Sequence, residues 1–528
     1  MQRRINPQNI FLLCLVGFFL IGVVWVRFRF LGVPLERDEG EYAYMAQQLL
    51  QGVMPYTEAH SMKFPGIYFV YAGILAILGQ SSSAIHLALL FVNLATAFLL
   101  YLLGRNLLSS SAGIVAGVSY AILTLSPSLQ GVWANSEHFV VLFATAGVLL
   151  LRGTQGEKLF YSGLLLGCAL LIKQHAIFFC LFGIIYLGAR VVSKPRTVSF
   201  LGIGLFAAGG LTPAILIGLI YGFTGNFAAF WFCTVQYASE YVSMTSLGQG
   251  FGNFKYNFAP ILEANFSILW LALMGLASVA WVKKSSREYL FLFGFFACSF
   301  LAITPGLYFR LHYFLLWMPA VALLAGAGFA SLTPIFLFAR LKTVIPVAIL
   351  TLVLGFPILL QKNFFFTLSV AEATREVYGL NPFLESSEIA KYINTHSKKD
   401  SPIAVLGSEP QIYFYAKRKS ATRHLYMYPL MEKHVYARPM QAEMIREIEE
   451  AHPEFVVVTN LSGSWVSSRP DFPSLLKDWA EAYLNSKYEI SGVVDIISRE
   501  ETLYIWGEPA RGYIPQSRYH LLIHKRRT

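Results

Sequence analysis

Long apolar runs alternate with short polar segments through the first 365 residues of the chain. Eleven of these runs are long enough, or nearly long enough, to cross a bilayer as a helix. Several have only about 14–16 residues, so the ends and the total number of spans are loosely defined. The predicted spans are 9–26, 83–104, 111–126, 138–151, 160–173, 176–190, 198–222, 261–282, 288–304, 312–330 and 343–361.

The segment between the first two runs, residues 27–80, has a different pattern. Tyr42, Met45 and Leu49 recur at helical spacing behind a charged start, which predicts an amphipathic helix lying at the membrane interface. The following stretch, 67–78, is apolar but short for a span, and we expect it beside the membrane. This segment is therefore predicted to be an elaborate external loop.

Residues 371–528 alternate helix and strand patterns. Helices are predicted at 387–396 and 440–451, strands at 403–406 and 454–459, and a β-hairpin at 488–506. Such alternation indicates a small α/β domain. The sequence thus predicts a transmembrane domain over 1–365 with external loop 27–80, and a soluble domain over 371–528 that carries no Gly-rich phosphate loop, zinc pattern or Ser-His-Asp signature.

Composition agrees with a membrane protein. Of the 528 residues, 55% are hydrophobic and only 13% are charged, and the mean hydropathy is +0.54. A soluble protein of this size would expose large apolar patches with so few charges. The predicted fold class is an α-helical polytopic membrane protein with about eleven transmembrane helices and a small C-terminal α/β domain.

Charge is distributed unevenly, and its distribution predicts orientation. Residues 371–528 carry 20 basic and 20 acidic groups, so the net charge of +11 belongs to the apolar part. If Arg3 and Arg4 are cytoplasmic and the spans alternate, the cytoplasmic side has 13 basic and two acidic groups, and the other side eight of each. The positive-inside rule then predicts a multi-pass inner-membrane protein with a cytoplasmic N-terminus and an extracytoplasmic C-terminal domain. We expect membrane lipids, and no nucleic acid, as partners.

Ionisable residues gather on the predicted external face. They lie in the loop 27–63, at Glu137, at Lys173-Gln174-His175, and at Arg310 and His312. Each alone is explained as a polar helix end that reaches the interface. Charged groups next to hydrocarbon are costly, however, and four separate loops with such groups on one face predict a functional site.

Four short motifs on this face resemble a known family. They are Arg37-Asp38-Glu39-Gly40-Glu41-Tyr42, Lys63-Phe64-Pro65-Gly66, Ala134-Asn135-Ser136-Glu137 and Arg310-Leu311-His312-Tyr313. In order and spacing they resemble the membrane-integral glycosyltransferases of the GT-C class, particularly the bacterial group related to protein O-mannosyltransferases and aminoarabinose transferases. The resemblance extends over most of residues 1–365.

The resemblance implies an inverting glycosyltransferase with a sugar donor carried on a polyprenyl phosphate. The acceptor would be a hydroxyl of a lipid, glycan or protein at the external face. A carboxylate can take the proton of the attacking hydroxyl, and fixed cations can stabilise the departing phosphate. The implied catalytic residues are Asp38 as the base and Glu137 as a group that orients the acceptor or pairs with a cation, and the implied donor-phosphate ligands are Lys63 and Arg310, assisted by His312, Tyr313 and Arg37.

Some positions depart from the family pattern or have a simpler explanation. Phe64 stands where the family commonly has proline, and Met62 where it often has an acid, so no metal and no other cofactor is predicted and a divalent cation lacks support. Asp38 alternatively caps the helix that follows it. Glu39 and Glu41 are then expected in a solvated first turn.

Two other functions stay open. A transporter or flippase of envelope precursors would also be polytopic, but the chain has no internal repeat and its charges gather at one surface. A non-catalytic assembly protein would use its tail to bind partners. Aromatic and Arg residues at 409–429 suit either sugar stacking or docking of the tail on the membrane domain, and docking is favoured. A transferase further requires that Asp38, Lys63, Glu137 and Arg310 line one cavity.

Overall fold

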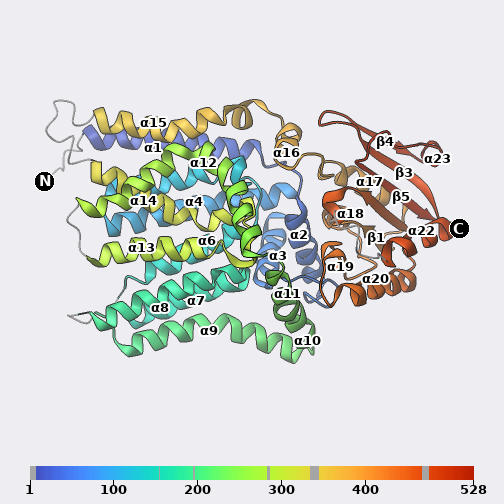
Figure 1. Ribbon diagram of the computed structural model, residues 1–528, viewed down its shortest axis with the longest axis horizontal. Helices are drawn as coiled ribbons and strands as arrows, with labels where there is room; N and C mark the ends of the chain where they lie inside the picture. Colours follow the sequence, from blue (N-terminus) through green and yellow to red (C-terminus); the bar gives the residue numbers. More distant parts are fainter. Residues whose placement is uncertain are drawn as a thin grey trace.

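A bundle of helices forms one end of the molecule and a small sheet domain forms the other (Figure 1). The computed structural model describes residues 7–153, 155–193, 197–281, 286–332, 344–465 and 475–527. The N-terminal end of the bundle and the C-terminus lie at opposite ends of the long axis (Figure 1). The long helices of the bundle are α1 (Pro7–Arg29), α4 (Ser82–Leu107), α5 (Ser110–Leu123), α6 (Ser136–Leu150), α7 (Gly156–Ile172), α8 (Ile177–Val192), α9 (Phe200–Phe223), α12 (Leu247–Ala277), α13 (Ser286–Leu301), α14 (Met318–Leu332) and α15 (Val344–Leu360).

Each predicted apolar run overlaps one of these helices, and most ends differ by a few residues. The exceptions are α12, which begins 14 residues before the predicted 261, and the predicted run 312–330, whose first residues form a separate 3-10 segment before α14. By length and composition, four described helical stretches can cross a membrane: Ser82–Leu107, Gln174–Val192, Phe200–Phe223 and Leu247–Ala280. Large apolar side chains on the outside of α9, among them Phe200 and Leu201, are about 70% exposed, as expected of lipid-facing residues. The chain is an integral membrane protein.

Glycines let some neighbouring helices pack closely. A Cβ added at Gly163 of α7 would overlap the Phe206 carbonyl oxygen of α9, and one at Gly209 of α9 would overlap the Phe160 carbonyl oxygen of α7. Small residues of this kind bring helix backbones together where lipid offers no hydrophobic drive to associate. The arrangement fixes α9 along α7.

Shorter helices cover the end of the bundle that faces the sheet domain (Figure 1). Two of them lie at the amphipathic and apolar stretches that the sequence placed at 40–50 and 67–78. The helical segment at 227–243 was not predicted. The unpredicted segment contains a π-helical turn, η3 (Phe232–Tyr237). The short helices are α2 (Arg37–Leu50), α3 (Gly66–Leu78), α10 (Phe227–Trp231) and α11 (Ala238–Ser243), followed after α15 by α16 (Val370–Tyr378).

The surroundings of α2 differ from the prediction. All residues from Glu39 to Gln48 are buried, so the solvated first turn expected for Glu39 and Glu41 is wrong. The N-cap is Glu36 rather than Asp38, because the Glu36 side chain accepts from the Glu39 amide and the Glu39 side chain accepts in return from the Glu36 amide. Asp38 is therefore free of the capping role.

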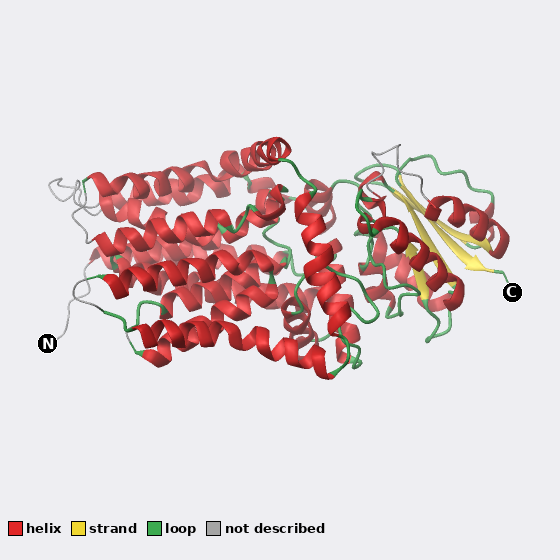
Figure 2. Cartoon of the chain, turned by 60° about the horizontal axis from the view of Figure 1, so that its bottom comes forward, coloured by secondary structure: helices red, strands yellow, loops and turns green. Residues whose placement is uncertain are grey.

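The C-terminal domain is a five-stranded mixed sheet with helices packed against it (Figure 2). The strand order is β1-β2-β5-β3-β4, with β1 and β2 parallel and the other neighbours antiparallel. The predicted strands and hairpin are confirmed, whereas β5 was not predicted. The strands are β1 (Ile403–Leu406), β2 (Phe455–Asn460), β3 (Tyr488–Ile496), β4 (Thr502–Trp506) and β5 (His520–Arg526), and the helices are α17 (Glu385–His396), α18 (Gln411–Ala416), α19 (Tyr428–Met431), α20 (Ala437–Ala451), α21 (Ser462–Trp465), α22 (Leu475–Lys487) and α23 (Glu508–Arg511).

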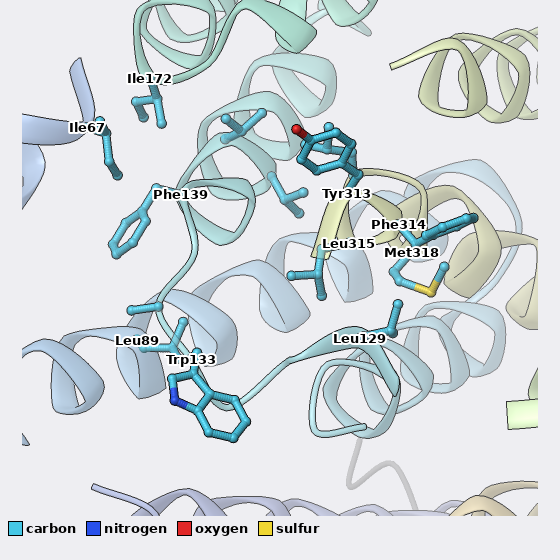
Figure 3. Packing of buried hydrophobic residues seen from close by; sticks show 14 of the residues in the cluster. Ile67, Leu89, Leu129, Trp133, Phe139, Ile172, Tyr313, Phe314, Leu315 and Met318 are labelled. Carbon is cyan, nitrogen blue, oxygen red and sulfur yellow. The ribbon is translucent and has the colours of Figure 1, made fainter. Parts of the chain in front are cut away.

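One hydrophobic core connects the bundle with the sheet domain. Its buried members include Tyr42 of α2, Phe139 of α6, Ile412 of α18 and Val405 of β1. Figure 3 shows part of it, where Phe139, Trp133, Leu315 and Met318 extend from different segments into the bundle interior. This shared core holds the sheet domain against α2, and the division into domains at 365–371 stays a prediction.

Most of the basic residues that predict the cytoplasmic side lie outside the part of the chain that the structure describes. Of the predicted cytoplasmic cations, those at positions 3, 4, 194, 196, 283, 284, 340 and 342 lie outside the described residues. The cytoplasmic N-terminus and external tail accordingly stay predictions.

Candidate active site

A cavity of about 170 Å³ lies between the bundle and the sheet domain. Its walls come from α2, the loop 51–65, the turn 173–175 between α7 and α8, η3 with α11, and the segment 305–313. The sheet domain closes one side with Tyr426, Tyr428 and Pro429. Segments that are hundreds of residues apart in sequence thus meet around one space.

Lys63 joins two carboxylates on one side of this cavity. Its Nζ donates to Asp38 Oδ1 at 2.9 Å and to Glu41 Oε2 at 2.6 Å. Asp38 and Glu41 are three residues apart on α2 and therefore share a face. Tyr68 donates to the second oxygen of Glu41 at 2.8 Å, and the Tyr426 hydroxyl lies 3.3 Å from Asp38 Oδ1.

Glu39 lies on another side of α2 and has structural partners. Its Oε1 is 2.9 Å from His86 Nε2 of α4 and accepts a hydrogen bond from the Ala134 amide. Its Oε2 accepts from the Glu36 amide at 3.2 Å. This carboxylate is 0% exposed, and it fixes the start of α2 so that Asp38 faces the cavity.

A second ion pair lies deeper than the Asp38 group. Lys173 Nζ donates to Glu137 Oε1, and His312 Nε2 is 3.9 Å from both Glu137 Oε1 and Asp38 Oδ2. The other ring nitrogen of His312 is 2.8 Å from Gln130 Oε1. If Nδ1 carries the proton and donates to this amide oxygen, Nε2 presents a lone pair between the two carboxylates.

Arg310 is the cavity cation for which the described residues provide no carboxylate partner. It lies immediately before η6 (Leu311–Leu316), it is exposed on the cavity side, and its Nη2 donates to the Tyr241 hydroxyl at 3.2 Å. Within the described part of the chain no carboxylate oxygen lies within 4.0 Å of its guanidinium. An unpaired guanidinium beside a cavity suits an anionic ligand, which it can bind through two parallel hydrogen bonds.

The backbone that leads to Arg310 is strained. Leu307 and Phe309 have φ values of +55° and +46°, the left-handed region that non-glycine residues rarely adopt. Strain of this kind persists only where the surrounding structure enforces it, and it is common at functional sites. Here it holds the 306–309 turn in the shape that places Arg310 at the cavity.

Lys63 also controls the ionisation of Asp38. Burial by itself would raise the pKa of the Asp38 carboxyl, but the neighbouring Lys63 ammonium, together with His312 and Arg310, outweighs burial and holds the pKa below its usual value. Asp38 is therefore a carboxylate at neutral pH. A carboxylate that faces a cavity can accept a proton from a bound hydroxyl group.

The sequence-predicted residues divide into three groups. Asp38, Lys63, Arg310 and Tyr313 line the cavity. Glu137 and His312 are buried next to it and do not line it, so the prediction that Glu137 faces the cavity together with the other three is wrong. The reason is that Lys173 neutralises Glu137 inside the protein.

Arg37 is held by the sheet domain instead of the cavity. Its Nη2 is 2.7 Å from Glu409 Oε1 and 2.8 Å from Asn381 Oδ1, and its Nε donates to the Ser408 carbonyl at 2.8 Å. It does not line the cavity. Since these acceptors occupy the guanidinium, we do not include Arg37 among the proposed phosphate ligands.

Sequence reasoning missed other cavity residues. Lys173 was interpreted as a polar helix end, although it lines the cavity and pairs with Glu137. Tyr241 and Glu41 had no assigned role. For the segment 409–429 both interpretations apply, because Glu409 docks Arg37 whereas Tyr426 and Tyr428 line the cavity.

Charged side chains of both signs surround the cavity. Two of the three cations, Lys63 and Lys173, have carboxylate partners, whereas the described residues give Arg310 none and leave it available for an anionic ligand. The pairs are Lys63 with Asp38 and Glu41, and Lys173 with Glu137, and Glu432 is a further carboxylate at the cavity. Among the cavity residues that the structure describes, His60 belongs to a group of three side chains that could hold a metal ion, and its two partners do not line the cavity.

The arrangement of bundle, external loop and sheet domain is the GT-C fold. Among solved structures the chain is similar to ArnT from Cupriavidus metallidurans bound to undecaprenyl phosphate, with a TM-score of 0.59 at 12% identity over 97% of each chain. It is also similar to the Archaeoglobus fulgidus oligosaccharyltransferase, with a TM-score of 0.52 at 11% identity over 96% of this chain and 75% of that one. At such identities the likeness establishes the fold.

The amino-acid sequence also matches the profile of one protein family over part of its length. The profile of the dolichyl-phosphate-mannose-protein mannosyltransferase family matches residues 60–217, from the second half of the external loop to α9. Compared with curated protein sequences, the chain has no significant match. The expected GT-C resemblance is thus confirmed.

Proposed function

We propose that this protein is an inverting glycosyltransferase that moves a sugar from a polyprenyl-phosphate donor to a hydroxyl of a lipid, glycan or protein. The observation that carries the proposal is the cavity where Asp38, Lys63 and the unpaired Arg310 meet. Support comes from the solved structures that the chain resembles, since the ArnT crystal structure is bound to undecaprenyl phosphate and archaeal AglB is in complex with an inhibitory peptide and a dolichol-phosphate.

In the proposed reaction the acceptor oxygen attacks the anomeric carbon while the bond from that carbon to the phosphate oxygen breaks. The hydroxyl proton passes to the Asp38 carboxylate, and the electron pair of the broken bond leaves with the polyprenyl phosphate. The reacting atoms must approach to about 3–3.5 Å, which requires base and phosphate ligands in one cavity. Attack from the side opposite the phosphate inverts the configuration.

The cations have different tasks in this proposal. Arg310 binds the donor phosphate, because its guanidinium has no carboxylate partner and can form bidentate contacts. Lys63 keeps Asp38 ionised and adds positive charge near the leaving group. Glu137 acts from behind the cavity wall by fixing Lys173, whose ammonium lies 4.2 Å from the Tyr313 ring centroid and lines the cavity.

The direct test compares envelope composition in cells. Mass spectrometry of glycolipids and glycoproteins is performed on cells with the wild-type protein, without it, and with Asp38→Asn. We expect one glycan mass to disappear in the absence of the protein and to stay absent with Asp38→Asn at normal membrane abundance. Restoration of the wild-type profile by Asp38→Asn would contradict the catalytic role and favour a transporter or assembly protein.

A further inference from the structure

A second polar cluster lies between the external loop and the sheet domain, next to the cavity. His60 comes from the loop, His424 precedes α19, and Glu443 is on α20. Glu443 Oε2 is 3.3 Å from His60 Nε2 and 3.0 Å from His424 Nε2. One ligating atom of each residue lies within 4.8 Å of the other two.

We propose that His60, His424 and Glu443 bind a divalent transition-metal ion, with zinc as the ion that the ligands suit best. Two imidazoles and one carboxylate form a common three-ligand set for zinc. Zinc bonds of about 2.0–2.2 Å in a tetrahedron place neighbouring ligand atoms roughly 3.3–3.5 Å apart. The distances from Glu443 Oε2 to the two imidazole nitrogens, 3.3 and 3.0 Å, are already close to this spacing.

The groups around the cluster favour this use. Cys233 Sγ is 3.2 Å from Nδ1 of His60, the ring nitrogen opposite the proposed ligand atom. A proton on Nδ1 that is donated to the sulfur leaves Nε2 free as a ligand, as outer partners of ligating histidines commonly do. Arg423 Nη1 is 3.7 Å from the other oxygen, Oε1, of Glu443, so Oε2 stays available for the ion.

The backbone holds the ligands in place without an ion. The His60 amide donates to the carbonyl oxygen of Arg423, next to His424, at 2.7 Å. His424 is buried at 2% exposure, whereas the Glu443 side chain is 30% exposed and offers a path from solvent. The site is therefore positioned in advance and can be entered, two requirements for a metal site.

The proposed ion would connect two parts of the chain that are 383 residues apart. His60 and Cys233 line the same cavity as Asp38 and Lys63. An ion bound there fixes the loop that carries Lys63 against the sheet domain that supplies Tyr426. Its open fourth position takes water or a donor atom of a ligand in the cavity. The inference does not depend on the proposed function.

A cluster joined only by hydrogen bonds is the competing explanation. In that case Glu443 Oε2 accepts protons from both Nε2 atoms, and added metal has no effect on stability. A ligand that binds only the folded state raises the melting temperature as its concentration exceeds its Kd. The two explanations therefore differ in the response of the wild-type protein to zinc.

The test uses the full-length protein in detergent, stripped with a chelator and titrated with zinc chloride against a fluorescent zinc indicator. We expect one zinc ion per chain and a melting temperature that rises by roughly 3 °C or more at saturating zinc. His424→Gln and Glu443→Gln should each weaken zinc binding about 100-fold or more and remove the rise. His396→Gln, a histidine exposed on the same domain, is the matched control and should behave as the wild type.

The wild-type titration keeps the proposal testable even if one variant fails to fold. Absence of stoichiometric zinc binding by the stripped wild type, or wild-type affinity in both Gln variants, would overturn the site. X-ray absorption at the zinc edge supplies an independent readout. A first shell of nitrogen and oxygen that loses one imidazole in His424→Gln supports the assignment, whereas a shell unaffected by that substitution contradicts it.

Discussion

Asp38 and Glu39 are adjacent in sequence and have opposite surroundings. Asp38 is 17% exposed, faces the cavity and contacts Lys63 and Tyr426. Glu39 is 0% exposed and accepts hydrogen bonds from two backbone amides, with His86 as its side-chain partner. The difference shows that a step of one residue along α2, about 100° around the helix axis, separates a carboxylate that can exchange partners with a ligand from one that holds the fold together.

The largest expected effect is on catalysis. Asp38→Asn keeps the shape of the side chain and removes the base, so the transfer rate should fall by about 10²–10⁴-fold. The melting temperature should change little, because Lys63 retains Glu41 as a partner. Initial rates and thermal unfolding of the purified variant provide the check. A rate within a factor of two of wild type would remove Asp38 from the mechanism.

Binding of the donor lipid should depend on Arg310. Arg310→Ala should weaken polyprenyl-phosphate binding by roughly 10–100-fold, the loss of a charge-assisted hydrogen bond. Arg310→Lys should recover part of it, since lysine has the charge without the planar fork. Titration of protein in nanodiscs with polyprenyl phosphate measures both.

Arg37→Ala is the matched control for that experiment. Its guanidinium is occupied by Glu409, Asn381 and Ser408, so this variant should lose stability and keep its affinity for polyprenyl phosphate. Equal losses of affinity in the two alanine variants would indicate that Arg310 acts only on the fold.

Stability should depend on the other carboxylate. Glu39→Gln replaces a buried acceptor with a group that cannot accept from all its present donors, which should lower the free energy of unfolding by about 1–3 kcal/mol. The rate per folded molecule should stay near wild type. Denaturant titration of the variant, with Glu58→Gln at an exposed loop carboxylate as control, checks this. An unchanged unfolding midpoint would contradict the structural role.

A smaller effect concerns pH. Because Lys63 holds the pKa of Asp38 below its usual value, Asp38 stays ionised as the pH falls through the mildly acidic range. In Lys63→Gln the burial of Asp38 is no longer outweighed, its pKa rises, and the acidic limb of the residual activity moves to higher pH. Lys419→Gln, at a lysine 54% exposed, should leave the limb in place. An unmoved limb in Lys63→Gln would mean that another group is the base.

Much of the fold follows from hydrophobic pattern, because membrane helices and buried strands have regular periods. The interior of the site does not. Glu39 and Glu41 were expected in solvent since nothing local reveals that the sheet domain covers α2. Lys173 was taken for a helix end because its partner Glu137 is 36 residues away. The cluster of His60, His424 and Glu443 was missed because its members have no recognisable spacing in the sequence. Long-range partners decide these positions.

The central claim is that the donor phosphate binds in the cavity beside Arg310 and Asp38. Cryo-electron microscopy of the protein in nanodiscs with polyprenyl phosphate tests it most directly. We predict density for the phosphate within hydrogen-bonding distance of the Arg310 guanidinium, inside the cavity that Asp38 and Lys63 line. Phosphate density elsewhere on the protein, with this cavity free of lipid, would contradict the account.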